Sequence, residues 1–286
     1  MRLLNAAAGV LVTLGALAAC GGAPSPSPSP SGPPVTSPSA SPAGVSSPPA
    51  ASASPSVSSP PLPDGFVALS DVDPTILQDI RYATAHNFVG RPVTGYERPR
   101  CLLARKAAEA LKGVQQKALE KGYSLKVYDC YRPQRAVDDF VRWSHDADQR
   151  MKGEFYPQEA KSRLFDDGYI GGPTAHSRGS TMDLTIVALP ARSQPAYDPA
   201  TPLVPCTSPA GERFPDNTVD MGTGFDCFDP LAHTAAGGVG PAQRANRELL
   251  TGLMAGGGFT NYPKEWWHYT LRNEPFPDTY YDFPVA

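Results

Sequence analysis

The chain has 286 residues with 25 basic and 28 acidic side chains, and its formal net charge is −3 at pH 7. The sequence contains neither a basic run nor basic residues interleaved with aromatic ones, which argues against a nucleic-acid partner. After Arg2, charged residues begin only at Asp64, and residues 64–286 suffice for one domain with a sizeable hydrophobic core.

Residues 1–20 have the pattern of an export signal. Arg2 supplies a short positive start, an apolar stretch follows, and small residues precede Cys20. The segment Leu17-Ala18-Ala19-Cys20 resembles the bacterial lipoprotein signal, in which the cysteine is lipidated and becomes the N-terminus. We therefore expect export to the outer face of the cytoplasmic membrane, with anchoring through lipid on Cys20. A transmembrane anchor and ordinary cleavage to a soluble product are the alternatives; the apolar stretch is short for a hydrocarbon core of about 30 Å.

Residues 21–63 consist almost entirely of Pro, Ser, Ala, Gly, Val and Thr, without charged or aromatic side chains. Such a composition buries too little apolar surface to offset the entropy lost on ordering, so we predict a disordered, partly polyproline II tether. At ~3.1 Å per residue its extended reach is on the order of 100 Å.

The folded part is predicted to begin its regular structure with a helix and a returning strand. Apolar residues recur at helical spacing from residue 101 to about 121, Gly122 can end the helix, and residues 123–129 are typical of a strand. A helix and strand of these lengths cover comparable distances in opposite directions. Cys130 is therefore expected to return towards Cys101.

Four cysteines lie in this region: Cys101, Cys130, Cys206 and Cys227. An even number in an exported domain indicates two disulfides, with three possible connectivities. The helix–strand pair favours Cys101–Cys130, which leaves Cys206–Cys227 to close the Pro-rich loop around residues 190–216. Free thiols and thiolate metal ligands are the alternatives, but no CxxC spacing supports the second.

The segment Ala175–Asp183 (AHSRGSTMD) is the first of two motifs with candidate metal ligands. Gly179 allows a sharp turn, and residues 182–189 are typical of a buried strand. His176 would lie on the loop that leads into this strand. Asp183 would lie at its start, where an unpaired charge is costly unless it binds a metal. A solvated or capping histidine is the alternative for His176.

The second motif is Glu265-Trp266-Trp267-His268. Its aromatic and β-branched surroundings favour a strand. Because positions three apart in a strand face opposite sides, Glu265 and His268 can meet one metal only across a bend or bulge. With His176 and Asp183, His268 completes a three-ligand set that leaves a fourth zinc position open, as in catalytic sites. A core strand with incidental polar ends is the alternative, and His233 is the reserve ligand.

Together with Asp129–Ala136 (DCYRPQRA), these motifs resemble the VanX-type zinc-dependent D-alanyl-D-alanine dipeptidases. The resemblance extends over nearly all of residues 66–286. It includes the segments DIRYAT at 79–84, Asn87-Phe88, GYE at 95–97, GTGFD at 222–226 and DFP at 282–284. We accordingly predict one α+β domain over residues 64–286, in which an antiparallel sheet carries the zinc site and helices pack outside.

The resemblance also implies catalytic roles. His176, Asp183 and His268 would bind one Zn²⁺ per chain. Glu265 would be the general base that takes a proton from water and delivers it to the leaving amine. Arg132 would stabilise the oxyanion, where losing one preorganised donor typically costs about 3–4 kcal/mol.

Four further residues are expected at the substrate. Tyr82 and Asp226 would bind the free ammonium of a dipeptide, Thr174 would lie near its carboxylate where the family has serine, and Asp129 would support Arg132 through a salt bridge. A carboxylate facing the ammonium favours free dipeptides over longer chains.

The expected function is therefore hydrolysis of D-Ala-D-Ala or short cell-wall peptides outside the cytoplasmic membrane. A D,D-carboxypeptidase or murein endopeptidase with the same metal chemistry is one alternative. A non-catalytic peptidoglycan-binding domain is another, although it would be expected to lose Glu265 or Arg132. The Pro-rich loop before Asp226 could also reshape the substrate mouth.

Overall fold

The structure is a computed structural model that describes residues 61–286. The expected signal peptide, Cys20 and nearly all of the expected tether lie outside the described residues. Among the helices of residues 61–286, none combines the length and apolarity needed to cross a bilayer.

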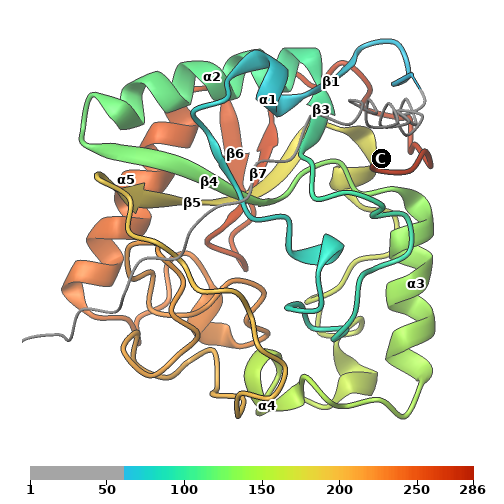
Figure 1. Ribbon diagram of the computed structural model, residues 1–286, viewed down its shortest axis with the longest axis vertical. Coiled ribbons are helices and arrows are strands. Elements are labelled where there is room, and N and C mark those ends of the chain that lie inside the picture. The colour runs from blue at the N-terminus through green and yellow to red at the C-terminus, as the bar shows by residue number, and fades with distance from the viewer. Residues whose placement is uncertain (1–60) are drawn as a thin grey trace, which may run out of the picture. The chain divides into compact units, whose positions relative to one another are not determined.

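A five-stranded sheet forms the centre of the fold (Figure 1). Its spatial order is β2 (Leu77–Gln78), β4 (Tyr123–Asp129), β5 (Thr181–Ala188), β7 (His268–Leu271) and β6 (Phe259–Asn261). All neighbouring pairs are antiparallel except β2 and β4, which run parallel. Almost every residue of β4 and β5 is buried, so both faces of the sheet centre are covered. The expected α+β class is confirmed, with one short parallel strand at the edge.

Helices α2 (Arg105–Leu119) and α5 (Pro241–Gly256) contact each other and cover one side of this sheet (Figure 1). The prediction of a helix from residue 101 was wrong for its first residues. Residues Leu102–Ala104 form strand β3, which pairs with β1 (Phe66–Ala68). They are buried throughout, whereas the exposed face of the helix begins only at Arg105. The four-residue helix α1 (Leu69–Val72) follows β1 directly.

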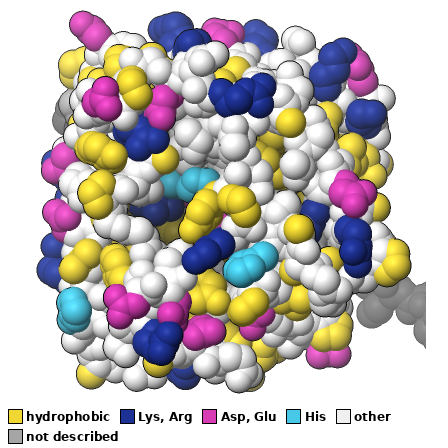
Figure 2. Space-filling model, turned by 180° about the vertical axis from the view of Figure 1, so that it is seen from behind, with side chains coloured by type: hydrophobic (Ala, Val, Ile, Leu, Met, Phe, Trp, Pro, Cys, Tyr) yellow, Lys and Arg dark blue, Asp and Glu magenta, His cyan; other side chains and the backbone are white. Residues whose placement is uncertain are grey.

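Two further helices lie at the right and at the bottom of Figure 1, and four 3₁₀ turns complete the described elements. They are helices α3 (Gln134–His145) and α4 (Lys152–Phe155) and four 3₁₀ turns: η1 (Arg81–Ala83), η2 (Lys161–Arg163), η3 (Ala175–Arg178) and η4 (Pro230–Ala232). Figure 2 shows acidic and basic side chains interspersed over one face of the molecule.

Both cysteine pairs expected from the sequence lie at disulfide distance. The sulfur atoms of Cys101 and Cys130 are 1.96 Å apart, and those of Cys206 and Cys227 are 2.00 Å apart. The first pair joins the residue before β3 to the residue after β4. The second joins the Pro-rich loop to the segment that carries Asp226.

Candidate active site

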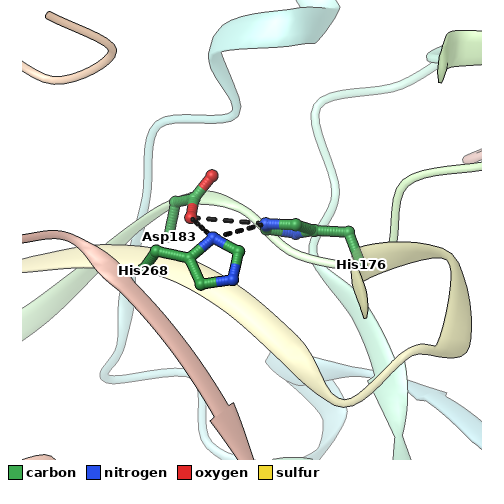
Figure 3. Close-up of side chains that lie close together, drawn as sticks. All are labelled: His176, Asp183 and His268. Carbon is green, nitrogen blue, oxygen red and sulfur yellow. Dashed lines mark hydrogen bonds and ion pairs between the residues drawn. The ribbon is translucent and has the colours of Figure 1, made fainter. Parts of the chain in front are cut away.

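Three side chains from separate parts of the chain converge at one point (Figure 3). His176 comes from η3, Asp183 from β5 and His268 from the first residue of β7. Asp183 Oδ1 lies 3.3 Å from His176 Nε2 and 3.2 Å from His268 Nδ1, and the two imidazole nitrogens are 3.3 Å apart. The three atoms thus form a nearly equilateral triangle.

The triangle has the dimensions of one face of a tetrahedral zinc site. Zinc bonds of about 2.0–2.1 Å to nitrogen and oxygen place tetrahedral ligands about 3.3–3.4 Å apart. Asp183 is only 2% exposed, and its Oδ1 is a buried oxygen without a hydrogen-bond partner among the described residues. A buried carboxylate oxygen aimed at two imidazole nitrogens fits a cation, because an unpartnered buried charge is otherwise costly. The donor set therefore fits zinc.

Sheet register brings two of these ligands together. Asp183 pairs with His268 on one neighbouring strand and with Asp129 on the other. Residues directly opposite one another across a sheet point to the same face, so the three side chains form a row. His176 reaches this row from η3, which Thr174 caps and Gly179 ends with a φ of 77°.

A backbone carbonyl orients the His176 ring. His176 Nδ1 donates to the Cys130 carbonyl at 2.8 Å, which leaves the Nε2 lone pair facing Asp183 and His268. Asp129 Oδ2 lies 3.4 Å from the same Nδ1. Burial by itself would raise the pKa of Asp183, but the two histidines outweigh it and hold that pKa below its usual range.

Glu265 lies beside the triangle in a turn. Glu265 N donates to the Tyr262 carbonyl at 3.0 Å, and β7 begins only at His268. The expected strand over 265–268 was therefore wrong, and the turn places Glu265 Oε2 at 3.3 Å from His268 Nδ1 without a bulge. Burial alone would lower the pKa of His268, but the neighbouring carboxylates of Asp183 and Glu265 raise it to about 9.

Arg132 lies beside Asp183 and lines the same cavity. Its Nε and Nη2 each lie 2.9 Å from Asp129 Oδ2, and Nη2 lies 3.5 Å from Asp183 Oδ2. Asp129 is fully buried and also accepts a hydrogen bond of 2.5 Å from the Tyr96 hydroxyl. The Tyr96 hydroxyl holds one oxygen of the Asp129 carboxylate, and the other oxygen contacts two nitrogens of Arg132. These contacts fix the orientation of the guanidinium, as a preorganised donor requires.

A cavity of about 270 Å³ contains these groups. Its walls include the ligands, Glu265, Arg132, Tyr82, Thr174 and Asp226, all of which the sequence singled out. Asp129 is not among the lining residues and reaches the cavity only through Arg132. The sequence reasoning missed the aromatic and aliphatic wall: Phe88, Phe140, Tyr169, Ile170, Phe228 and Tyr262. Tyr169 and Tyr262 lie a few residues before Thr174 and Glu265, and this closeness in sequence to site residues was the one signal that could have identified them.

Comparison with known proteins supplies the family. The family model described as D-ala-D-ala dipeptidase (Peptidase_M15) matches residues 63–191 and 215–286. The chain belongs to this family. It is 40% identical over 222 residues to the D-alanyl-D-alanine dipeptidase of Streptomyces coelicolor, covering 77% of this chain and 98% of the relative. The corresponding enzyme of Enterococcus faecalis is 38% identical over 78% of this chain and 99% of its own length. That of Escherichia coli is 31% identical over 72% and 83%.

Membership in the D-ala-D-ala dipeptidase family confirms the resemblance drawn from the motifs. The cavity also holds the two residues expected at a substrate ammonium. Tyr82 donates to Asp226 Oδ2 at 2.8 Å, and both side chains are buried. Burial, followed by the nearby Asp183, raises the pKa of Asp226 well above its usual range, although the Tyr82 hydrogen bond lowers it. A cation beside Asp226 would relieve the same penalty.

Thr174 and His233 have different surroundings. Thr174 Oγ1 lines the cavity and accepts from the His176 backbone N–H at 3.4 Å, so it also shapes the ligand loop. His233, the reserve ligand, is not part of the triangle; its carbonyl instead accepts from Arg247 at 2.6 Å.

The family match omits residues 192–214, which form most of the Pro-rich loop. Among the described residues that line the cavity of the candidate site, none belongs to this loop. The loop instead borders a second cavity of about 490 Å³. Tyr197 and Phe214 hold it there by packing on His86, with ring centroids 4.3 and 4.2 Å away. The loop therefore does not line the cavity of the candidate site, and its covalent link to that site is the Cys206–Cys227 pair beside Asp226.

Proposed function

We propose that this chain is a zinc-dependent D-alanyl-D-alanine dipeptidase that is exported and acts in cell-wall peptide metabolism. The observation that carries the proposal is one cavity lined by a zinc-sized His176–Asp183–His268 triangle, Glu265, Arg132 and a buried Asp226. Membership in the family and similarity to enzymes named D-alanyl-D-alanine dipeptidase support the substrate.

The chain's own residues divide the chemistry between them. Zinc held by the triangle would supply a Lewis acid for the scissile carbonyl and the attacking water. Glu265 takes a proton from that water and delivers it to the leaving amine. Arg132, held by Asp129, stabilises the negative charge that develops on the former carbonyl oxygen. The burial of these groups strengthens each of these interactions.

The other end of the cavity selects a free dipeptide. Asp226 and the Tyr82 hydroxyl receive the ammonium, and Thr174 offers a hydroxyl towards the carboxylate end. A longer peptide presents an uncharged amide in place of the ammonium. Asp226 would then stay buried without a cationic partner, a penalty that rejects such substrates.

Export is proposed from the sequence. The lipoprotein-type signal ending at Cys20 and the tether 21–63 would hold the catalytic domain outside the cytoplasmic membrane. The two cysteine pairs support this, because disulfides persist mainly in oxidising compartments.

The substrate proposal is tested by incubating the purified protein with free D-Ala-D-Ala, with N-acetyl-D-Ala-D-Ala and with a muramyl pentapeptide. We expect release of D-alanine from the free dipeptide and little from the other two. Cleavage of the pentapeptide alone would contradict the proposal and favour a D,D-carboxypeptidase. Binding of any of these peptides without cleavage would favour a non-catalytic domain.

A further inference from the structure

Each of the two disulfides ends next to a residue of the candidate active site. Cys130 follows Asp129 and lies two residues before Arg132. Cys227 follows Asp226, and its partner Cys206 belongs to the segment 192–214 that the family match omits. Each cross-link therefore attaches backbone next to a site residue to another part of the chain.

The first disulfide holds the group that orients a metal ligand. The Cys130 carbonyl accepts the hydrogen bond from His176 Nδ1, and the next residue, Tyr131, donates from its backbone N–H to the Leu102 carbonyl at 2.9 Å. Cys101 is itself anchored, because its backbone N–H donates to Gln78 Oε1 at 2.9 Å. The cross-link therefore fixes the carbonyl against β3.

The second disulfide holds the backbone that presents Asp226. Within residues 61–286, Asp226 is the only non-glycine residue with a positive φ, at 55°. A left-handed conformation at such a residue is strained and persists only where the surroundings impose it. The surroundings here include the Cys206 carbonyl, which accepts from Gly224 N at 2.8 Å, and Cys206 N, which donates to the Glu154 carbonyl at 2.9 Å.

The residues on either side of Asp226 and Cys227 are also held in place. Phe228 N donates to the Phe155 carbonyl at 2.8 Å, so both α4 and the omitted loop hold the chain on either side of Asp226. Two residues before the cysteine, Phe225 stacks on Tyr128 with ring centroids 4.4 Å apart. The strained backbone at Asp226 is thus held from both sides. Among the contacts described here, the disulfide is the only covalent cross-link.

We propose that the two disulfides are positioning elements for separate halves of the active site: Cys101–Cys130 for the metal through His176, and Cys206–Cys227 for the substrate ammonium through Asp226. The second half rests on the proposed dipeptidase function, whereas the first requires only metal binding. Reduction would therefore impair the two functions independently, and the enzyme would be competent only where both bonds are kept.

The test uses two double variants, Cys101→Ser with Cys130→Ser, and Cys206→Ser with Cys227→Ser. Zinc affinity is measured by competition with a chromogenic chelator. Affinity for D-Ala-D-Ala is measured by calorimetry on zinc-loaded protein that also carries Glu265→Gln, so that turnover does not interfere. Val114→Ala, in the buried contact between α2 and α5, is the control for general loss of stability.

We expect the first double variant to bind zinc about 10- to 100-fold more weakly, as for loss of an outer hydrogen-bonding partner of a ligand. The second should bind the dipeptide about 5- to 100-fold more weakly, because Asp226 would relax from its strained backbone conformation and binding would have to restore it. Its zinc affinity should be unchanged. Val114→Ala should change neither affinity. Wild-type affinities in both folded double variants, or equal losses in Val114→Ala, would overturn the proposal.

A variant that fails to fold is replaced by the wild-type protein reduced with a phosphine under native conditions. Release of zinc while the far-UV circular dichroism stays constant supports the proposal, and retention of zinc by fully reduced, folded protein overturns it. Failure of the oxidised wild type to bind the dipeptide would instead count against the proposed function. The zinc measurement is independent of that result.

Discussion

Replacing Tyr82 with Phe removes one hydroxyl from the ammonium end of the cavity. The ring keeps its packing on Phe88 and Phe140, and the Arg132 guanidinium still lies 5.1 Å from its centre. The Asp226 carboxylate loses the 2.8 Å hydrogen bond from the hydroxyl. In the proposed complex the hydroxyl oxygen also accepts from the substrate ammonium. A hydrogen bond to a charged group contributes about 1.5–3 kcal/mol, so losing this one corresponds to a rise in KM for D-Ala-D-Ala of about 10- to 150-fold.

The pH dependence of KM should change in a defined direction. Burial raises the pKa of Asp226, so the carboxylate that binds an ammonium forms only as pH rises through that raised value. The Tyr82 hydrogen bond lowers this pKa, and its loss shifts the profile of KM to still higher pH. Zinc affinity should stay constant, because Tyr82 is hydrogen-bonded to Asp226 rather than to a ligand.

The assay follows release of D-alanine at several pH values, alongside zinc affinity by chelator competition. Tyr96→Phe is the matched control, since this buried tyrosine donates to Asp129 rather than to Asp226. It should lower kcat through Arg132 more than it raises KM. A Tyr82→Phe variant with unchanged KM, or with weakened zinc binding, would refute the reasoning.

Two further variants test the base and the scaffold. Glu265→Gln should retain zinc and lower kcat by roughly 10²- to 10⁴-fold, the usual contribution of a general base; full activity would exclude Glu265 from that role. Asp139→Asn should lower the free energy of unfolding by about 1–2 kcal/mol at pH 7, because it disrupts hydrogen bonds from Arg91 and Thr94. Burial alone would raise the pKa of Asp139, but these bonds hold it below its usual range, so its contribution is present above the unfolded pKa of about 3.9 and is lost as pH falls. Denaturant unfolding should therefore show a larger difference from wild type at pH 7 than at pH 2, where part of the contribution is already lost, and an equal difference at both would contradict this.

The sequence identified the chemical groups of the site better than the backbone that presents them. His176, Asp183 and His268 carried recognisable motifs, and their types alone indicate a metal. Their approach depends on β5 pairing with both β4 and β7, which join segments more than 50 residues apart. Local periodicity contains no information about such pairings, so the row of Asp129, Asp183 and His268 could not be predicted.

Two local predictions failed for definable reasons. The apolar residues of β3 precede α2 without a break, so a helical pattern and a buried strand overlapped. Glu265 was predicted in a strand because tryptophans favour strands. Trp266 and Trp267 instead belong to a turn, and their side chains are buried in the core. The Trp266 indole donates to Thr223 at 2.8 Å. Tertiary packing outweighed propensity at this position.

The loop 192–214 shows a different limit of sequence-based prediction. It has no apolar periodicity, and proline-rich composition predicts only that it is irregular. Its position is determined by contacts distant in sequence, namely the packing of Tyr197 and Phe214 on His86 and the cross-link to Cys227. The cysteine pairing was predictable, whereas the cavity that the loop borders was not.

The most direct test of the central claim is a zinc titration of metal-free protein during hydrolysis of D-Ala-D-Ala. We predict that the rate rises in proportion to added zinc and saturates at one zinc per chain, and that His176→Ala abolishes this dependence. Hydrolysis that persists after metal removal, or its absence at every zinc concentration, would contradict a zinc dipeptidase built on His176, Asp183 and His268.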